Sequence, residues 1–185
     1  MPVSLASTSA SSMHGAMVPI ASFVGTGSYV AEFTNIPQTY QDLMLVIYGR
    51  DTATGTTTSF YGNFNGLNVT NTYSHTTLSG NGSSASSSRT TNQNQFSGFG
   101  AIPGANATAG ILGSSVMHIL NYANTTTFKT FINRSAADTN GSGVTTLDVG
   151  LWQNTAAITS ISINPVNAFQ TNSGMTLYGI RSVNQ

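Results

Sequence analysis

The sequence predicts an all-β domain built as an antiparallel sandwich or barrel, and three observations lead to this prediction. Nearly half of the 185 residues are Ser, Thr, Asn or Gly, and only 5% are charged. Ser, Thr and Asn compete with the helical backbone for its hydrogen bonds, so this composition disfavours helices and suits strands with polar turns. Short apolar or alternating segments also recur between turn residues, and no segment shows a helical period.

The N-terminal segment, residues 1–15, differs from the rest of the chain. It is rich in Ser and Ala, has no hydrophobic period, and lacks the basic region and long apolar run of a secretory signal. We therefore expect an extended arm over 1–15 and a single β-domain over 16–185. Within the arm, the residues expected to contact a neighbouring subunit are Pro2, Val3 and Leu5.

The first strands of the domain follow from local patterns. Residues 17–23 carry Pro19, which cannot donate to a strand ladder and favours an edge position. Residues 29–34 and 59–65 alternate apolar and polar side chains, as half-buried strands do. Residues 43–48 (LMLVIY) are continuously apolar, which predicts a central strand covered on both faces.

The middle segment, 67–110, is dense in Ser, Gly, Asn and Thr and includes the run SGNGSSASSSR at 79–89. We expect a loop-rich insertion here, exposed at one end of the domain. Its aromatic and charged side chains could contact a partner or a sugar. These candidate surface-contact residues are Tyr73, His75, Arg89 and Phe96.

Strand patterns resume after this segment, and turn residues separate them. The segment SAADTNGSG, which starts at residue 135, predicts a hairpin. Trp152 ends an apolar strand and is predicted to lie in the core. The expected strands are 113–122, 126–134, 144–152, 157–163 and 174–183.

Charge and composition exclude several classes of partner. The formal net charge is zero and the five basic residues are scattered singly, whereas nucleic-acid binding needs clusters of Lys and Arg. The absence of cysteine excludes disulfides and thiolate metal sites. No apolar run approaches the length of a membrane span. A nearly uncharged chain is poorly protected from association, so we expect it to work in an assembly.

No motif of an enzyme family occurs in the chain. GxSxG, HExxH and P-loop patterns are absent, and the five carboxylates show no paired spacing. His118 is interpreted as a hydrogen-bonded histidine within or beside the core. Residues 138–141 (DTNG) resemble the start of a calcium loop, but no glutamate follows, so a hairpin turn is preferred. We predict no catalytic, metal or cofactor site, and that the protein is not an enzyme.

Seven segments stand out together: FTNIPQTYQDLMLVIYGR (33–50), FNG (64–66), YSHTTLSGNGSS (73–84), MHILNYANTTTFKTF (117–131), NGSG (140–143), GLW (150–152) and TLYGIR (176–181). They resemble a family of tailed-bacteriophage virion proteins, commonly described as tail-fibre, tail or minor structural proteins. The likeness spans about residues 18–181. It implies a β-sandwich of jelly-roll type, displayed on a virion surface and often trimeric, and it supplies no catalytic residue.

Two functions are consistent with these patterns. The leading hypothesis is a capsid decoration (cement) protein, a homotrimer bound to the major capsid protein, because a domain that starts near Met1 leaves no room for a fibre shaft. The alternative is a tail-fibre tip or receptor-binding module whose 67–110 loops contact host glycans. Uncharged polar side chains can hydrogen-bond sugar hydroxyls, and Tyr73 or Phe96 could stack on a sugar ring. Both hypotheses place the protein at the virion surface.

Overall fold

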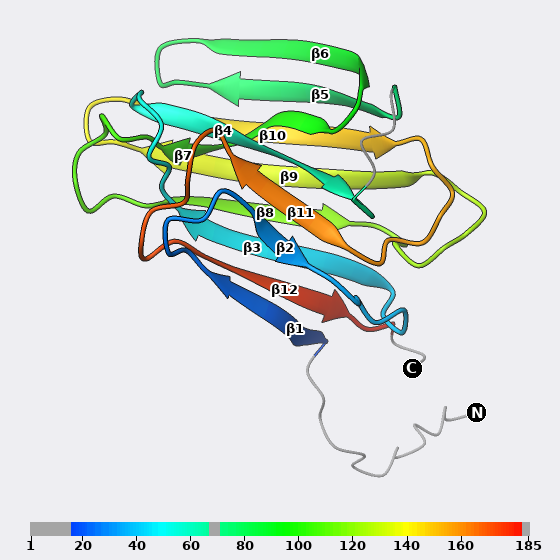
Figure 1. The fold of residues 1–185 in the computed structure, drawn as a ribbon. Coiled ribbons are helices and arrows are strands. Elements are labelled where there is room, and N and C mark those ends of the chain that lie inside the picture. Colours follow the sequence, from blue (N-terminus) through cyan, green and yellow to red (C-terminus); the bar gives the residue numbers. More distant parts are fainter. Residues whose placement is uncertain (1–15, 67–70, 183–185) are drawn as a thin grey trace, which may run out of the picture.

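Two antiparallel sheets packed face to face make up the fold in the computed structural model, which describes residues 16–66 and 71–182 (Figure 1). The large sheet contains, in spatial order, β1 (Met17–Val24), β12 (Gly174–Ile180), β3 (Asp42–Gly49), β8 (Gly113–Ile119), β9 (Lys129–Asp138), β10 (Gly143–Trp152), β5 (Tyr73–Gly80) and β6 (Ala85–Gln93). The small sheet contains β2 (Ala31–Phe33), β11 (Ile161–Pro165), β4 (Thr57–Phe64) and β7 (Phe96–Pro103).

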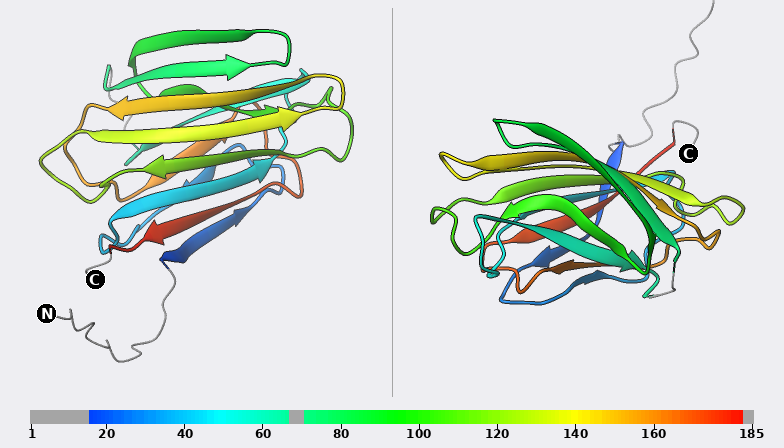
Figure 2. Two further views of the ribbon diagram at one scale, coloured as in Figure 1. Left: turned by 180° about the vertical axis from the view of Figure 1, so that it is seen from behind. Right: turned by 90° about the horizontal axis from the view of Figure 1, so that it is seen from above.

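The prediction of an all-β antiparallel sandwich is confirmed, and no described residue is helical. Seen from above, the two sheets lie as two layers (Figure 2). The jelly-roll type stays a prediction. The proposed arm, with Pro2, Val3 and Leu5, lies outside the described residues.

Of the predictions for the large sheet, the one for its edge strand is confirmed and the one for its central strand is partly wrong. β1 is an edge strand, as Pro19 predicted, and its pairing with β12 has a register shift next to that residue. β3 is an interior strand, but the prediction that both its faces are covered is wrong. Leu45 is fully buried, whereas Tyr48 on the other face is 48% exposed. The small sheet covers one face of the large sheet only, which leaves the alternate side chains of β3 uncovered.

The predicted loop-rich insertion at 67–110 is wrong, because β5, β6 and β7 lie within it. β5 and β6 form a hairpin at Asn81-Gly82. Gly82 has a φ of +86°, and the Asn81 side chain accepts hydrogen bonds from the backbone N–H groups of Ser83 and Ser84. β6 is exposed along almost its whole length, so it needs no apolar alternation and carried no hydrophobic signal of a strand.

The hairpin predicted between β9 and β10 is confirmed. Asn140 and Gly141 have φ angles of 58° and 120°, and both are positive, as the central residues of a type I′ turn require. β9 starts and ends later than predicted, and runs to Asp138. This turn fixes the register of the two strands that carry the buried polar residues Lys129, Asn133, Ser135 and Asp148.

The core between the sheets is dominated by aromatic rings. Trp152 is fully buried, as predicted, and its ring centroid lies 5.5 Å from that of Phe64 and 6.2 Å from that of Tyr73. Phe131 packs against the same cluster from β9. A Cβ atom at Gly150 would lie 2.3 Å from the Phe131 ring, so glycine at this position lets the ring sit flat on β10.

Candidate functional site

Two of the four candidate surface-contact residues are core aromatics. Tyr73 and Phe96 are each 1% exposed, and their ring centroids lie 6.1 Å apart. The Tyr73 hydroxyl oxygen accepts a hydrogen bond of 2.9 Å from the Phe64 N–H, and burial raises the Tyr73 pKa. The prediction that these residues contact a partner or a sugar is therefore wrong. Both are strand residues that point between the sheets, and they do not lie in loops.

The other two candidates, His75 and Arg89, lie on opposite faces of the large sheet. His75 is 7% exposed, its ring lies 5.0 Å from that of Phe99, and its Nδ1 atom has no hydrogen-bond partner among the described residues. The surface assignment of His75 is therefore also wrong. Arg89 is exposed on β6 and keeps its surface role as a prediction.

A buried carboxylate ties the two sheets together near His75. Asp148 is fully buried, and its oxygens accept hydrogen bonds from both sheets. The donors are Thr77 Oγ1 (2.7 Å), Thr146 Oγ1 (3.0 Å), Asn133 Nδ2 (3.1 Å) and the Gly100 N–H (3.3 Å). We call these residues the Asp148 cluster. Because Gly100 belongs to the small sheet and the others to the large one, the cluster is a polar cross-link inside the sandwich.

Two buried cations lie outside this cluster, and both are held by backbone carbonyl groups. The Arg50 guanidinium, on a side chain only 6% exposed, donates to carbonyls of the segment between β7 and β8. Its acceptors are Ala107 (2.6 Å), Thr108 (2.6 Å), Ala105 (3.2 Å) and Ile111 (3.5 Å). Lys129 donates to Thr127 and Thr155, and burial lowers its pKa. These hydrogen bonds hold the backbone of the neighbouring loops in place. Because both cations are buried and already paired with carbonyl groups, neither is open to a ligand.

His75 makes the stability depend on pH. Burial lowers the pKa of His75, and the Asp148 carboxylate opposes that shift with a smaller effect. The unfolded chain then takes up a proton at a higher pH than the folded chain. Neutral His75 therefore contributes fully to the free energy of unfolding above the ordinary histidine pKa of about 6.5. That contribution is lost as the pH falls below this value, because the unfolded chain is then protonated first.

We expect His75→Gln to remove this pH dependence. The difference in free energy of unfolding between wild type and variant should be constant above about pH 7 and should shift against the wild type as the pH falls below about 6.5. Urea unfolding at several pH values measures it, and His14 and His118 cancel because both proteins contain them. A difference that does not change with pH would contradict the assignment.

The large sheet has one face turned away from the small sheet, and we call it the outer face. Cross-strand partners on it form rows of apolar side chains. One row runs Tyr178, Met44, His118, Ile132, Val149, and the next runs Val46, Val116, Arg134, Leu147, Leu78. Leu78, Val149 and Leu147 are 54%, 44% and 41% exposed. The outer face therefore carries two adjacent, largely apolar rows, which His118 and Arg134 interrupt and which end at Thr76 and Thr176.

Charge on the outer face is sparse. The Asp42 carboxylate lies 3.2 Å from His118 Nε2 and also accepts a 2.7 Å hydrogen bond from the Asn121 N–H, so this pair is internally satisfied. This contact agrees with the interpretation of His118 as a hydrogen-bonded histidine. Arg134 lies among apolar neighbours, and Arg89 lies at the β6 end. Sequence reasoning missed this surface, although the run LDVGLW (147–152) carries apolar residues on both faces of its strand.

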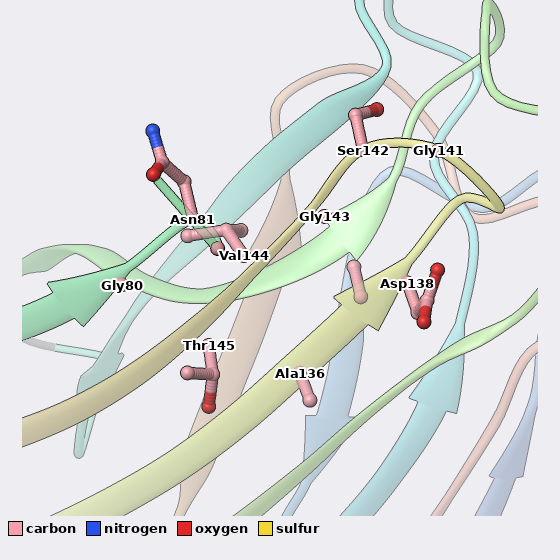
Figure 3. Close-up of a pocket in the computed structure, with 11 residues that line it drawn as sticks. Gly80, Asn81, Ala136, Asp138, Gly141, Ser142, Gly143, Val144 and Thr145 are labelled. Atoms are coloured by element: carbon pink, nitrogen blue, oxygen red, sulfur yellow. The ribbon is translucent and has the colours of Figure 1, made fainter. Parts of the chain in front are cut away.

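A hollow of about 420 Å³ lies between the β5–β6 and β9–β10 turns (Figure 3). Its polar side chains include Asn81 and Asp138, which come from different turns. Asp138 Oδ1 accepts the Asn140 N–H at 2.9 Å, and Asn81 Oδ1 serves its own turn. Nowhere in residues 16–66 and 71–182 do three His, Cys, Asp or Glu side chains gather in a way that could hold a metal ion.

The comparisons with known proteins leave the family open. No protein-family model, curated protein or solved structure matches the chain. The resemblance to phage virion proteins therefore stays a prediction. In the described part of the chain, no helix is long and apolar enough to cross a membrane.

Proposed function

We propose that this protein is a non-catalytic structural subunit of a tailed-phage virion, a capsid decoration protein that works as a homotrimer on the virion surface. The observation that carries the proposal is the outer face of the large sheet. Contiguous exposed apolar surface on a soluble domain marks a site of protein association, and here it extends over several adjacent strands.

The electrostatics of the chain support association through this face. Interface cores are depleted of charge, and burying an unpaired charge is costly. On the outer face Asp42 and His118 already pair, so a partner would need to accommodate only Arg134 near the centre. A chain with zero net charge also has little self-repulsion to overcome. The trimeric state and the capsid partner rest on the family resemblance alone.

We expect Leu147→Glu to disrupt the assembly without unfolding the chain. Leu147 is 41% exposed, and its cross-strand partner Arg134 can compensate the new carboxylate within the monomer. Burying that carboxylate in an interface would cost several kcal/mol. In sedimentation experiments the wild type should behave as a trimer and the variant as a smaller species, with at least about a hundredfold weaker association.

A matched control tests whether position on the outer face matters. Val166 is 51% exposed but follows β11 of the small sheet, so Val166→Glu should leave the trimer intact. Gold-labelled antibody on phage particles should mark the capsid. A wild-type chain that stays monomeric at about 1 mM (about 4 kcal/mol of association free energy) would refute the homotrimer, and label at the tail tip would refute the decoration role.

A receptor-binding module is the second candidate, and one observation favours it. A depression of about 400 Å³ at the β6 end of the outer face is lined by Arg89 and by hydroxyl groups, including those of Thr76 and Thr130. Hydroxyl and guanidinium groups can hydrogen-bond sugar hydroxyls. Glycan-array binding that Arg89→Ala abolishes and Leu147→Glu preserves would support this candidate over the first.

A further inference from the structure

The four edges of the two sheets differ in how they are protected against pairing with another strand. β1 contains Pro19 and a register shift, and β2 has only three residues. β7 is irregular at two places in its pairing with β4, has positive φ angles at Gly98 and Gly100, and ends at Pro103. Such bulges, prolines and short lengths are the devices that keep sheet edges from pairing.

β6 has only one of these devices, a register shift between Thr90 and Gln93, close to its C-terminal end, where Asn92 has a positive φ of 58°. It has nine residues, no proline and a single charged side chain, Arg89. Its register with β5 is continuous from His75–Thr90 to Gly80–Ala85. It is the outermost strand of the large sheet, at the edge opposite β1 (Figure 1). Among the four edge strands, residues 85–90 of β6 are therefore a regular stretch without proline or bulge.

The turn that precedes β6 fixes which of its backbone groups are free. The Asn81 N–H donates to the Ser84 carbonyl, so these residues form a hydrogen-bonded pair. Bonding alternates along an antiparallel ladder, which makes 79–86, 77–88 and 75–90 the next bonded pairs. The N–H and C=O groups that point away from β5 therefore belong to Ala85, Ser87 and Arg89.

We propose that β6 pairs with β6 of a second copy of this chain, antiparallel and about a two-fold axis at Ser87. The two large sheets would then become one continuous sheet. Each outward-pointing residue would form a bonded pair, with Ser87 opposite its own counterpart and Arg89 opposite Ala85 of the partner subunit.

Charge and shape favour a second copy as the occupant of this edge. In the two-fold register the two Arg89 side chains are not directly opposite, so like charges do not meet across the strands. The remaining side chains of β6 are uncharged, and all but those of Thr90 and Gln93 are exposed. A second strand can therefore approach along residues 85–90. This contact goes beyond the proposed function, because a trimer built on the outer face leaves β6 available to join copies in pairs.

Amide hydrogen exchange on the wild-type chain tests the pairing directly. At about 1 mM the amides of Ala85, Ser87 and Arg89 should exchange at least about tenfold more slowly than at about 1 µM. The amides of Ser86, Ser88 and Thr90 bond to β5 and should be protected at both concentrations. This alternating, concentration-dependent pattern is specific to pairing at the β6 edge.

The variant Ser87→Pro removes one outward donor and no hydrogen bond to β5, so it should abolish the concentration-dependent protection of Ala85 and Arg89. Ser87→Thr keeps the N–H and should behave as the wild type. Three results would overturn the proposal: fast exchange of the outward amides at both concentrations, protection that survives in folded Ser87→Pro, or protection that appears only when phage particles are added. Fast exchange of the outward amides could occur while the trimer stays intact. The β6 pairing can therefore be refuted without refuting the proposed trimer.

Discussion

Replacement of Asp148 by alanine should lower the free energy of unfolding by at least about 3 kcal/mol, because each buried donor left without an acceptor costs about 1–3 kcal/mol. Four donors lose this acceptor at once: the Asn133 Nδ2 and Gly100 N–H groups are buried, and the Thr77 and Thr146 hydroxyls are part-buried. The Gly100 N–H belongs to the small sheet, so the substitution should also weaken the attachment of one sheet to the other. Urea unfolding followed by tryptophan fluorescence reports both, because Trp152 lies on the same strand.

Two variants sharpen this experiment. Asp148→Asn keeps the shape but turns one acceptor oxygen into a donor that faces other donors, so an intermediate loss of stability is expected. Glu32→Ala removes an exposed carboxylate from β2 and should change the stability by less than about 0.5 kcal/mol. If Asp148→Ala stays within about 1 kcal/mol of the wild type, the Asp148 cluster does not hold the sheets together.

Arg50→Met should also destabilise the chain by about 3 kcal/mol, since hydrogen bonds to charged groups contribute about 1.5–3 kcal/mol each. Methionine keeps the apolar stem of the side chain but none of the guanidinium donors. The carbonyl groups of Ala105, Ala107, Thr108 and Ile111 would lose their common donor. The loss should appear first in the segment 104–112 between β7 and β8.

Limited proteolysis combined with urea unfolding distinguishes this local effect from a general one. Cleavage within 104–112 should accelerate in Arg50→Met at temperatures where the sheets remain folded. Arg134→Met, which removes an exposed arginine from the outer face, should leave both the cleavage rate and the urea midpoint near those of the wild type. Equal behaviour of the two variants would show that the Arg50 contacts do not stabilise this segment.

Features set by local chemistry could be predicted from the sequence. The edge position of β1 follows from Pro19, and the β9–β10 hairpin follows from Asn140-Gly141. Asn81-Gly82 carries the same hairpin signal, yet its Ser-rich flanks lack apolar alternation. β6 has no such alternation because neither of its faces is covered, so its strand state depends on pairing with β5 rather than on a hydrophobic pattern.

The surface could not be predicted in the same way, because burial in this fold depends on distant strands. Tyr73 is buried by rings from β4, β7 and β10, and nothing in its Ser- and Thr-rich surroundings indicates those partners. Charged side chains usually face solvent and apolar ones the core, but β10 shows the reverse. Asp148 is buried, whereas Leu147 and Val149 are exposed. Asp148 can be buried because donors from three other strands reach it.

The pairing of β1 with β12 also bears on how the chain folds as it is made. β1 is the first described strand to leave the ribosome, yet its only neighbour in the sheet is the last strand of the chain. Contacts between residues so far apart in sequence make folding slow, since the long intervening chain must be ordered before they form. The large sheet can therefore be completed only after synthesis has reached its C-terminal strand, and β1 must wait unpaired until then.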